Sequence, residues 1–464
     1  MSRVDVVRLL YIVAFALFIY GLMGLTGPRT AVRGNRIAAV GMAIAVIATL
    51  LLPGMGNWGL IALGVVIGTV VGVPAARQVR MTAMPQMVAL FNGVGGGAVA
   101  LIAWAEFRHS SGFADEPTYV AIFSLFAAIV GSVSFWGSNI AFGKLQEILP
   151  GRPITLGRGQ QFVNLALLLA AVACGTAIVA GSDAELLMIA LLLAAALLGN
   201  FVVLPIGGAD MPVVISLLNA FTGLSAAATG VALNNTALIV AGMIVGASGS
   251  ILTNLMAQAM NRSIPAIVAG GFGGVVTAGG VADDGTERTV RSTSAADAAV
   301  QMTYANRVVV VPGYGMAVAQ AQHAVREMTK LLEAKGIEVS FAIHPVAGRM
   351  PGHMNVLLAE ADVPYEQLKE MDEANSEFGR TDVSLIIGAN DVTNPDARNK
   401  PDSPIYGMPI LNVDESQSVI VLKRSMNSGF AGIDNPLFYG ERTSMLFGDA
   451  KASVSEITEE LKAL

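Results

Sequence analysis

The stretch Arg307-Val-Val-Val-Val-Pro-Gly-Tyr-Gly-Met-Ala-Val318 decides the fold of the C-terminal part of the chain. Its four consecutive valines are typical of a strand buried on both faces, and the two glycines that follow allow a tight backbone turn. The next residues predict a helix from about residue 316 to residue 334 and a second strand over residues 338–343. This order indicates a βαβ unit, so we expect an α/β Rossmann-like domain with a doubly wound parallel sheet.

The same glycine turn is a candidate phosphate site. Glycines let the backbone approach a pyrophosphate, and the N-terminus of the helix supplies N–H groups and a partial positive charge. The G-x-G-x-x-V pattern is weakly specific by itself, and its place between a strand and a helix makes it moderately specific.

The ends of two strands distinguish the possible nucleotides. An NAD-binding unit usually ends its second strand in Asp or Glu, which binds the ribose 2′-hydroxyl, but here His344 and Pro345 follow that strand. A later strand over residues 418–422 ends in Lys423 and Arg424. This pair suits a phosphate because Arg binds it with a planar fork and Lys with a point charge. The alternative is a solvated strand end, but together with the missing acid the pair favours NADP over NAD.

Three glycine- or amide-rich loops follow predicted strands, at residues 344–353, 388–395 and 425–432. Open α/β sheets bind ligands at the carboxyl ends of their strands, so we expect the cleft to be lined by Arg349, Gly352, Asn390 and Asp391. Arg349 is either a phosphate ligand or a surface charge of its loop. Asp391 either caps a loop or is a titrating group that responds to the redox state of the ligand.

The charged residues divide the 464-residue chain into two parts. Of its 62 charged side chains, 20 fall in residues 1–262 and 42 in residues 263–464. With 54% hydrophobic residues overall, this distribution excludes an ordinary cytosolic enzyme and a disordered chain. The acidic excess of the second part argues against nucleic-acid binding. We therefore expect a transmembrane domain at residues 1–262, a flexible glycine-rich linker at 263–295 and the nucleotide-binding domain at 296–464.

Nine apolar segments of the first part are long enough to cross a bilayer as helices, which needs about 20 residues. They cover residues 7–26, 37–53, 58–76, 84–105, 118–142, 161–180, 185–206, 210–232 and 236–259. Nine Lys and Arg side chains fall on one side of these spans and three on the other. Because Lys and Arg concentrate on the cytoplasmic side, we expect the C-terminal domain in a bacterial cytoplasm and the N-terminus outside the cell membrane.

A few polar residues fall inside the predicted spans, where they are costly and often functional. They are Asn92, Ser138, Asn139, Asp210 and Asn219. A hydrogen bond between helices accounts for each one singly, and Asp210 also suits a helix N-cap. Several of them at similar depth favour a water-lined path. The single cysteine, Cys174, rules out an intrachain disulfide and a cysteine metal site, and we expect no metal.

Several motifs closely resemble the β subunit family of proton-translocating NAD(P) transhydrogenase. They are residues 312–322, 344–360, 388–391 and 423–427 in the C-terminal part, with residues 207–214 and 259–263 in the membrane part. The resemblance extends over essentially the whole chain.

The resemblance implies an enzyme, a proton-translocating NAD(P)+ transhydrogenase of the Si-specific/Re-specific type. It implies reversible hydride transfer between NAD(H) on a separate α subunit and NADP(H) on this chain. The transfer would be coupled to proton translocation and would favour NADPH. The α subunit would also add membrane helices, in an α2β2 assembly in the bacterial inner membrane.

The resemblance also implies site residues. Asp391 would serve the catalytic step, residues 346–351 would cover the pyrophosphate, Lys423 and Arg424 would hold the 2′-phosphate, and residues 425–432 would close as a lid. The full set of implied cofactor contacts is Gly313, Tyr314, Gly315, Met316, Ala317, Val346, Ala347, Gly348, Arg349, Met350, Pro351, Gly388, Ala389, Asn390, Asp391, Gly407, Met408, Lys423, Arg424, Ser425, Met426, Gly429, Phe430, Asp449 and Ala450.

Two residues depart from the pattern of that family. Many members have His at the position of Asn92, and Asn cannot titrate. The expected proton path therefore relies on Asp210, Ser138, Asn219 and Arg262, with Asn92 limited to holding water or orienting a neighbour. Phe430 replaces a common Tyr, so it can pack on the cofactor but cannot donate a phenolic hydrogen bond.

Two other functions fit membrane spans joined to a Rossmann-like domain. One is a channel or transporter gated by a nucleotide-sensing domain, which would conduct without a redox partner. The other is a membrane flavoprotein reductase, which would need a second dinucleotide fold that this sequence does not indicate.

Overall fold

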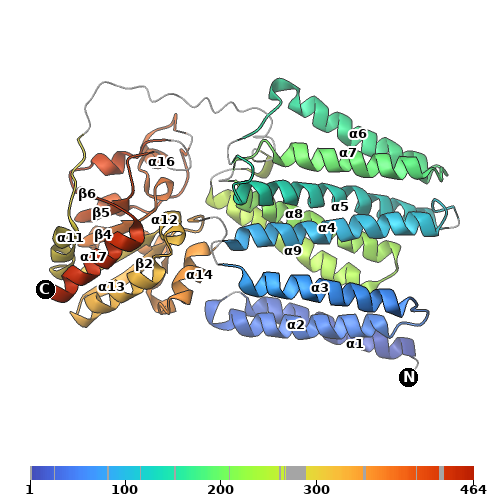
Figure 1. Ribbon diagram of the computed structural model, residues 1–464, viewed down its shortest axis with the longest axis horizontal. Helices are drawn as coiled ribbons and strands as arrows, with labels where there is room; N and C mark the ends of the chain where they lie inside the picture. The colour runs from blue at the N-terminus through green and yellow to red at the C-terminus, as the bar shows by residue number, and fades with distance from the viewer. Residues whose placement is uncertain are drawn as a thin grey trace. The chain divides into compact units, whose positions relative to one another are not determined.

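A computed structural model describes residues 3–25, 27–80, 83–114, 116–150, 153–207, 210–260, 263–265, 267, 289–348, 352–403, 405–427 and 433–464 of the chain. These residues form two compact units, each with its own core. One consists of long apolar helices and the other contains a six-stranded sheet (Figure 1).

In the part of the chain that the structure describes, nine helices are long and apolar enough to cross a membrane, which confirms the nine predicted spans. They are α1 (Arg3–Gly24), α2 (Pro28–Leu50), α3 (Trp58–Gln78), α4 (Met84–His109), α5 (Thr118–Leu145), α6 (Gln160–Val179), α7 (Glu185–Val203), α8 (Met211–Ala232) and α9 (Thr236–Ala259). Helices suit this setting because each satisfies its own backbone hydrogen bonds without water.

Several helices extend beyond the predicted spans, and in two of them the extension includes basic residues that lie outside the predicted spans. Helix α2 begins at Pro28 rather than at residue 37, so Arg33 and Arg36 are exposed on a helix and not in a connection. Proline is well suited to the first turn of a helix, and the helical backbone remains satisfied beyond the apolar stretch. Helix α5 likewise continues to Leu145 and includes Lys144, which lies beyond the predicted span of residues 118–142.

Lys144 is buried at the end of α7. Its Nζ donates to the carbonyl oxygens of Leu204 and Ile206, at 2.5 and 2.7 Å. Because a helix C-terminus carries a partial negative charge and unpaired carbonyl groups, a buried ammonium group is stabilised there. Lys144 therefore joins α5 to the turn that leads from α7 towards α8.

Close helix packing in this unit depends on small residues. Helices α4 and α5 cross where a Cβ added to Gly96 would lie 2.8 Å from the carbonyl oxygen of Gly131. Helices α8 and α9 cross where a Cβ on Gly242 would lie 2.4 Å from the backbone nitrogen of Ala227. Such contacts replace the hydrophobic driving force that lipid removes.

The second unit has a parallel sheet of order β3-β2-β1-β4-β5-β6, which confirms the Rossmann-like fold. Its strands are β1 (Arg307–Pro312), β2 (Glu338–Ile343), β3 (Leu368–Glu370), β4 (Val383–Ile387), β5 (Ser418–Lys423) and β6 (Thr443–Phe447). In register, Val310 of β1 lies between Phe341 of β2 and Leu385 of β4. The valine run is buried on both faces, as its lack of alternation predicted.

Helices cover both faces of the sheet (Figure 1). One face packs against α11 (Ala295–Thr303), α13 (Gln322–Ala334) and α17 (Ala450–Ala463), and α13 and α17 lie side by side. The other face packs against α15 (Met371–Asn375) and the short helix η7 (Pro436–Tyr439), where Phe378 and Phe438 are fully buried. The remaining helices, α12 (Tyr314–Val318), α14 (His353–Glu360) and α16 (Asp396–Asn399), belong to the loops at the carboxyl ends of the strands.

The prediction of one continuous helix over residues 316–334 is wrong. This segment forms two helices, α12 and α13, separated at Gln320, whose φ of +50° is left-handed. A left-handed residue ends a helix, and glutamine gives no sequence signal for it. The result is a short first helix that begins directly at the glycine turn.

Candidate functional site

The carboxyl ends of β1 and β4 meet in a backbone contact between glycines. The N–H of Gly313 donates to the carbonyl oxygen of Ile387 at 2.9 Å, and that of Gly315 to the carbonyl oxygen of Gly388 at 3.0 Å. A Cβ on Gly313 would lie 2.4 Å from the backbone of Ala389, and one on Gly388 would lie 2.3 Å from the Cα of Gly315. Only glycine fits at these positions, so the predicted residues 313–317 and 388–391 are adjacent.

The loop after β2 folds against the start of α12. The rings of Tyr314 and His353 lie edge to face, with their centroids 6.3 Å apart. Gly348 has a φ of +103°, and a Cβ there would lie 2.5 Å from Nδ1 of His353. The predicted contacts Val346, Ala347 and Gly348 therefore lie close to the glycine turn. Arg349, Met350 and Pro351 lie outside the described residues.

His344, directly after β2, joins two of the predicted contact segments. It is buried, its Nδ1 accepts from the N–H of Val346 at 3.2 Å, and its Nε2 lies 2.8 Å from the carbonyl oxygen of Pro409. These partners require a proton on Nε2 and none on Nδ1. Burial lowers the pKa of His344 to about 4, against a smaller opposite effect of the Pro409 carbonyl, so the ring is neutral at pH 7.

Pro409, whose carbonyl oxygen binds His344, directly follows two further predicted contacts, Gly407 and Met408. Gly407 has a φ of +78°, and its N–H donates to the carbonyl oxygen of Ala397 in α16 at 2.8 Å. His344 thus brings the segment of residues 407–409 to the loop after β2. His344 is not among the predicted contacts, although the motif at residues 344–360 begins with it.

Two buried asparagines join the loop after β4 to the segment that follows the predicted lid. Asn435 donates from Nδ2 to the carbonyl oxygen of Asn390 at 3.0 Å, and its Oδ1 accepts from the N–H of Leu437. Asn394 donates from Nδ2 to the carbonyl oxygen of Asp434 at 3.0 Å. Neither Asn394 nor Asn435 is among the predicted contacts, although Asn394 lies in the predicted amide-rich loop of residues 388–395. Their contacts fix the loop that carries Asp391 to one end of the lid segment.

Lys423 lies at the carboxyl end of β5, as predicted. Its Nζ donates to the carbonyl oxygen of Asn427 at 2.7 Å and lies 4.6 Å from the ring centre of Phe438. Burial lowers the pKa of Lys423, and the carboxylates of Asp434 and Asp391 oppose this effect. The ammonium group therefore lies in the field of the predicted catalytic residue.

The other predicted contacts near Lys423 differ in their environment. Arg424 and Ser425 are exposed to solvent, whereas Met426 packs against the core of the sheet. Gly429 and Phe430 lie outside the described residues.

The predicted contacts Asp449 and Ala450 are held beside the same strand end. The N–H of Gly448 donates to the carbonyl oxygen of Lys423 at 3.1 Å. Asp449 caps α17 by accepting from the N–H groups of Lys451 and Ala452. The turn after β6 therefore adjoins the Lys423–Arg424 pair.

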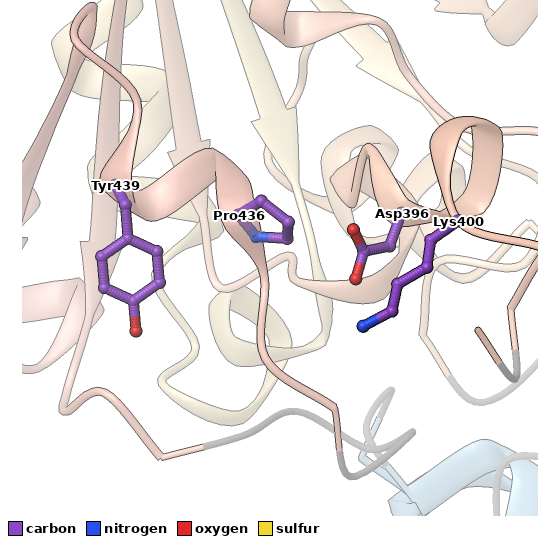
Figure 2. Close-up of a pocket in the computed structure, with 4 residues that line it drawn as sticks. All are labelled: Asp396, Lys400, Pro436 and Tyr439. Carbon is purple, nitrogen blue, oxygen red and sulfur yellow. The ribbon is translucent and has the colours of Figure 1, made fainter. Parts of the chain in front are cut away.

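A cavity of about 300 Å³ lies beside the joined loops (Figure 2). Asp396 and Lys400 reach into it from α16 and the residue that follows, and Pro436 and Tyr439 line it from η7. None of these four residues belongs to the predicted set. The cavity flanks the attachment of the lid segment and is distinct from the glycine contact.

In the helical unit, two of the predicted proton-path residues lie together. Asn92 of α4 donates from Nδ2 to the hydroxyl of Ser138 of α5 at 2.9 Å and to that of Ser134 at 3.3 Å. Ser134 lies 2.6 Å from the hydroxyl of Thr222 of α8. These four residues form a polar cluster, and Oδ1 of Asn92 is buried with no hydrogen bond to any described residue.

The other polar residues of the spans do not join this cluster. Asn139 donates to the carbonyl oxygen of Phe135 in its own helix. The side chain of Asn219 makes no hydrogen bond with the described residues, and Asp210 lies in the turn before α8. Arg262 lies outside the described residues. Ser134 and Thr222 are not among the predicted residues, although Ser134 lies one helical turn from Ser138.

Comparison with known proteins gives consistent similarities. The family model described as "PNTB: NAD(P) transhydrogenase beta subunit" matches residues 7–460. The chain is 49% identical to the NAD(P) transhydrogenase subunit beta of Rhodospirillum rubrum over 461 residues, which cover 97% of this chain and 98% of the relative. The protein of the same description from a named strain of that species has the same identity and coverage.

Proposed function

This chain belongs to the NAD(P) transhydrogenase beta subunit family, and we propose that it binds NADP(H) for a hydride transfer whose other nucleotide, NAD(H), is on a partner α subunit. The transfer is reversible, is coupled to proton translocation and favours NADPH. This makes the complex a proton-translocating transhydrogenase of the Si-specific/Re-specific type.

The basic pair at the end of β5 supports NADP(H) as the nucleotide of this chain. Lys423 and Arg424 lie at the carboxyl edge of the sheet, where open α/β sheets bind ligands, and β2 is followed by a neutral histidine where an acid would repel a 2′-phosphate. The 2′-phosphate is bound by the planar fork of Arg424 and the ammonium group of Lys423. The glycine turn at residues 313–315, which packs against residues 388–389 and begins α12, would hold the pyrophosphate.

The residues of this chain act in the transfer by position and charge. The nicotinamide supplies the hydride chemistry, and the protein holds the ring, excludes water and completes the lid. Asp391 adds a negative charge near Lys423 and so contributes to the electrostatic field at the site. The lid, residues 425–432, closes between two fixed ends, Lys423 and Asn435.

The coupling to protons requires energy exchange between two sites. Because the same ring is oxidised and reduced, the chemistry supplies little driving force, whereas one charge that crosses 100 mV supplies about 2.3 kcal/mol. Proton movement must therefore change the affinity for NADP(H). The proposed path includes Asn92, Ser138, Asp210, Asn219 and Arg262. Asn92 holds water or orients a neighbour, because its amide cannot titrate.

The same family membership supports a proposal for the assembly and the location. The proposed assembly is α2β2 in the bacterial inner membrane, with the C-terminal domain in the cytoplasm and the N-terminus outside. The proposed domain limits are 1–262 for the proton-translocating domain, 263–295 for the linker and 296–464 for the nucleotide-binding domain. The distribution of Lys and Arg between the two sides of the spans supports this orientation.

A titration of the full chain with NADPH and with NADH tests the nucleotide assignment. Strong preference for NADPH supports the proposal. Preference for NADH, or no binding of either nucleotide, contradicts the role of Lys423 and Arg424. Flux through the chain without an α subunit would instead indicate a nucleotide-gated channel.

A further inference from the structure

A second cavity, of about 330 Å³, lies at the ends of α3, α4 and α5 in the helical unit. Val79, Met87 and Phe142 are among the residues that form its apolar wall. The cavity lies at the helix ends that carry Arg77 and Arg80, which the distribution of basic residues assigns to the cytoplasmic surface of the bilayer.

The rim of this cavity is basic and rich in amide groups. Arg80 is its one formally charged lining residue, and no carboxylate lines it among the described residues. Arg80 forms no ion pair with any described residue. The side-chain amides of Gln78 and Gln146 form no hydrogen bond with any described residue either. An anion bound here would meet one guanidinium fork and two amide N–H donors without displacing an existing partner.

The cavity also has an unfilled hydrogen-bonding position in its buried wall. Gln86 is only 7% exposed, and its Nε2 donates to the carbonyl oxygen of Leu145 at 3.2 Å. Its Oε1 has no hydrogen-bond partner among the described residues. A buried acceptor without a donor costs free energy, so a ligand that brings a hydroxyl group to this wall would be favoured.

An apolar surface leads from the cavity into the membrane. Helix α3 has no buried residue in the described structure, and Val66, Val70 and Val73 are among its exposed side chains. A ligand with an anionic head and a hydrocarbon tail would fit both regions at once. Its phosphate would lie at Arg80 and its chain along α3. Basic pockets between membrane helices on the cytoplasmic side bind the headgroups of anionic lipids in this way.

We propose that this cavity is a binding site for an anionic glycerophospholipid with a hydroxylated headgroup, such as phosphatidylglycerol. The phosphate binds Arg80, Gln78 and Gln146, a headgroup hydroxyl donates to Gln86, and an acyl chain packs on Val79 and along α3. The residues that line this cavity include none of the predicted nucleotide contacts and none of the Asn92 cluster.

The test is native mass spectrometry of the complete α/β complex after reconstitution in nanodiscs of phosphatidylcholine with or without phosphatidylglycerol. The wild-type complex retains phosphatidylglycerol in preference to phosphatidylcholine. Arg80→Gln lowers this preference about fivefold, because one cation at a membrane surface contributes about that factor. Arg33→Gln, which removes an exposed charge of α2 outside the cavity, leaves the preference unchanged.

Two further measurements exclude other readings. Arg80→Lys retains the charge and therefore most of the preference; its loss in a folded Lys variant would overturn the proposal, even if Arg80→Gln fails to fold. Excess glycerol 3-phosphate should not displace the lipid, and displacement would mean a small soluble phosphate is the ligand. Lipid retained by the isolated chain but absent from the complex would show that the partner subunit covers the cavity, which also contradicts the proposal.

Discussion

The side-chain amide of Asn435 donates to the backbone oxygen of Asn390 at 3.0 Å, across 45 residues of sequence. A second bond, to Oδ1 of Asn390, measures 3.3 Å. Asn435 is 1% exposed, so water cannot replace these bonds. These hydrogen bonds therefore hold the loop after β4 to the residues that follow the lid segment.

This contact predicts the effect of removing a single donor. Asn435→Asp retains the oxygen that accepts from Leu437 and loses the Nδ2 donor to Asn390. We expect a loss of about 1–3 kcal/mol in the free energy of unfolding, and weaker NADPH binding because the lid loses one attachment. Chemical denaturation and NADPH titration measure the two effects. Asn399→Asp, at an exposed position, should change neither, and an unchanged Asn435→Asp protein would refute the attachment.

The glycine contact predicts a difference between two glycine substitutions. Gly388→Ala places a Cβ 2.3 Å from the Cα of Gly315 in a residue with a φ of +66°, whereas Gly379 has no atom within 4 Å of its missing Cβ. We expect Gly388→Ala to lower the free energy of unfolding by about 2 kcal/mol or more and to abolish nucleotide binding. The free energy of unfolding of Gly379→Ala should stay within about 1 kcal/mol of the wild-type value. Equal unfolding midpoints of the two variants would contradict the close approach.

The basic pair predicts selective loss of one nucleotide. Lys423→Ala combined with Arg424→Ala should weaken NADPH binding on the order of a hundredfold, because two charge-assisted contacts are removed. NADH binding should change much less, since NADH lacks the 2′-phosphate. The matched control is Lys330→Ala with Lys335→Ala, which removes two exposed charges at α13. Titration calorimetry distinguishes the cases, and equal losses for both nucleotides would reject the 2′-phosphate assignment.

His344 predicts a pH dependence of stability. Its pKa of about 4 in the folded chain lies below the ordinary value of 6.5, so the folded state binds fewer protons than the unfolded state. Its contribution is complete above pH 6.5 and is lost as the pH falls towards 4, by about 3 kcal/mol in total. Denaturation at several pH values between 4 and 6.5 measures this effect. In His344→Gln the free energy of unfolding should depend less on pH, whereas in His323→Gln, whose side chain is exposed, the pH dependence should stay as in wild type. If the pH dependence of the free energy of unfolding is the same in His344→Gln as in wild type, His344 is not its cause.

The sequence predicted the elements whose pattern is local. Apolar runs of about 20 residues identified the nine spans, because a membrane leaves the helix as the simple way to satisfy the backbone. The valine run and its glycines identified β1 and the turn after it for a similar reason. The break at Gln320 and the edge strand β3 escaped prediction, since one has no glycine and the other has only three residues.

The site was predictable only in part. The glycines and the Lys423–Arg424 pair follow strands directly, so their place at the sheet edge could be read from order alone. The partners of Asn394 and Asn435 lie 40 and 45 residues away, and His344 reaches Pro409 over 65 residues. Such contacts depend on how loops fold over the sheet, and no spacing in the sequence encodes them.

The meeting of Gly313 and Gly388 has an evolutionary consequence. Neither position can gain a side chain while the other strand end stays where it is, so the two glycines constrain each other and neither can drift alone. The contact itself does not discriminate between dinucleotides, because the N–H groups of Gly313 and Gly315 already donate to Ile387 and Gly388. We therefore expect a change of nucleotide preference in descendants of this chain to arise at exposed side chains of the sheet edge, such as Arg424 after β5.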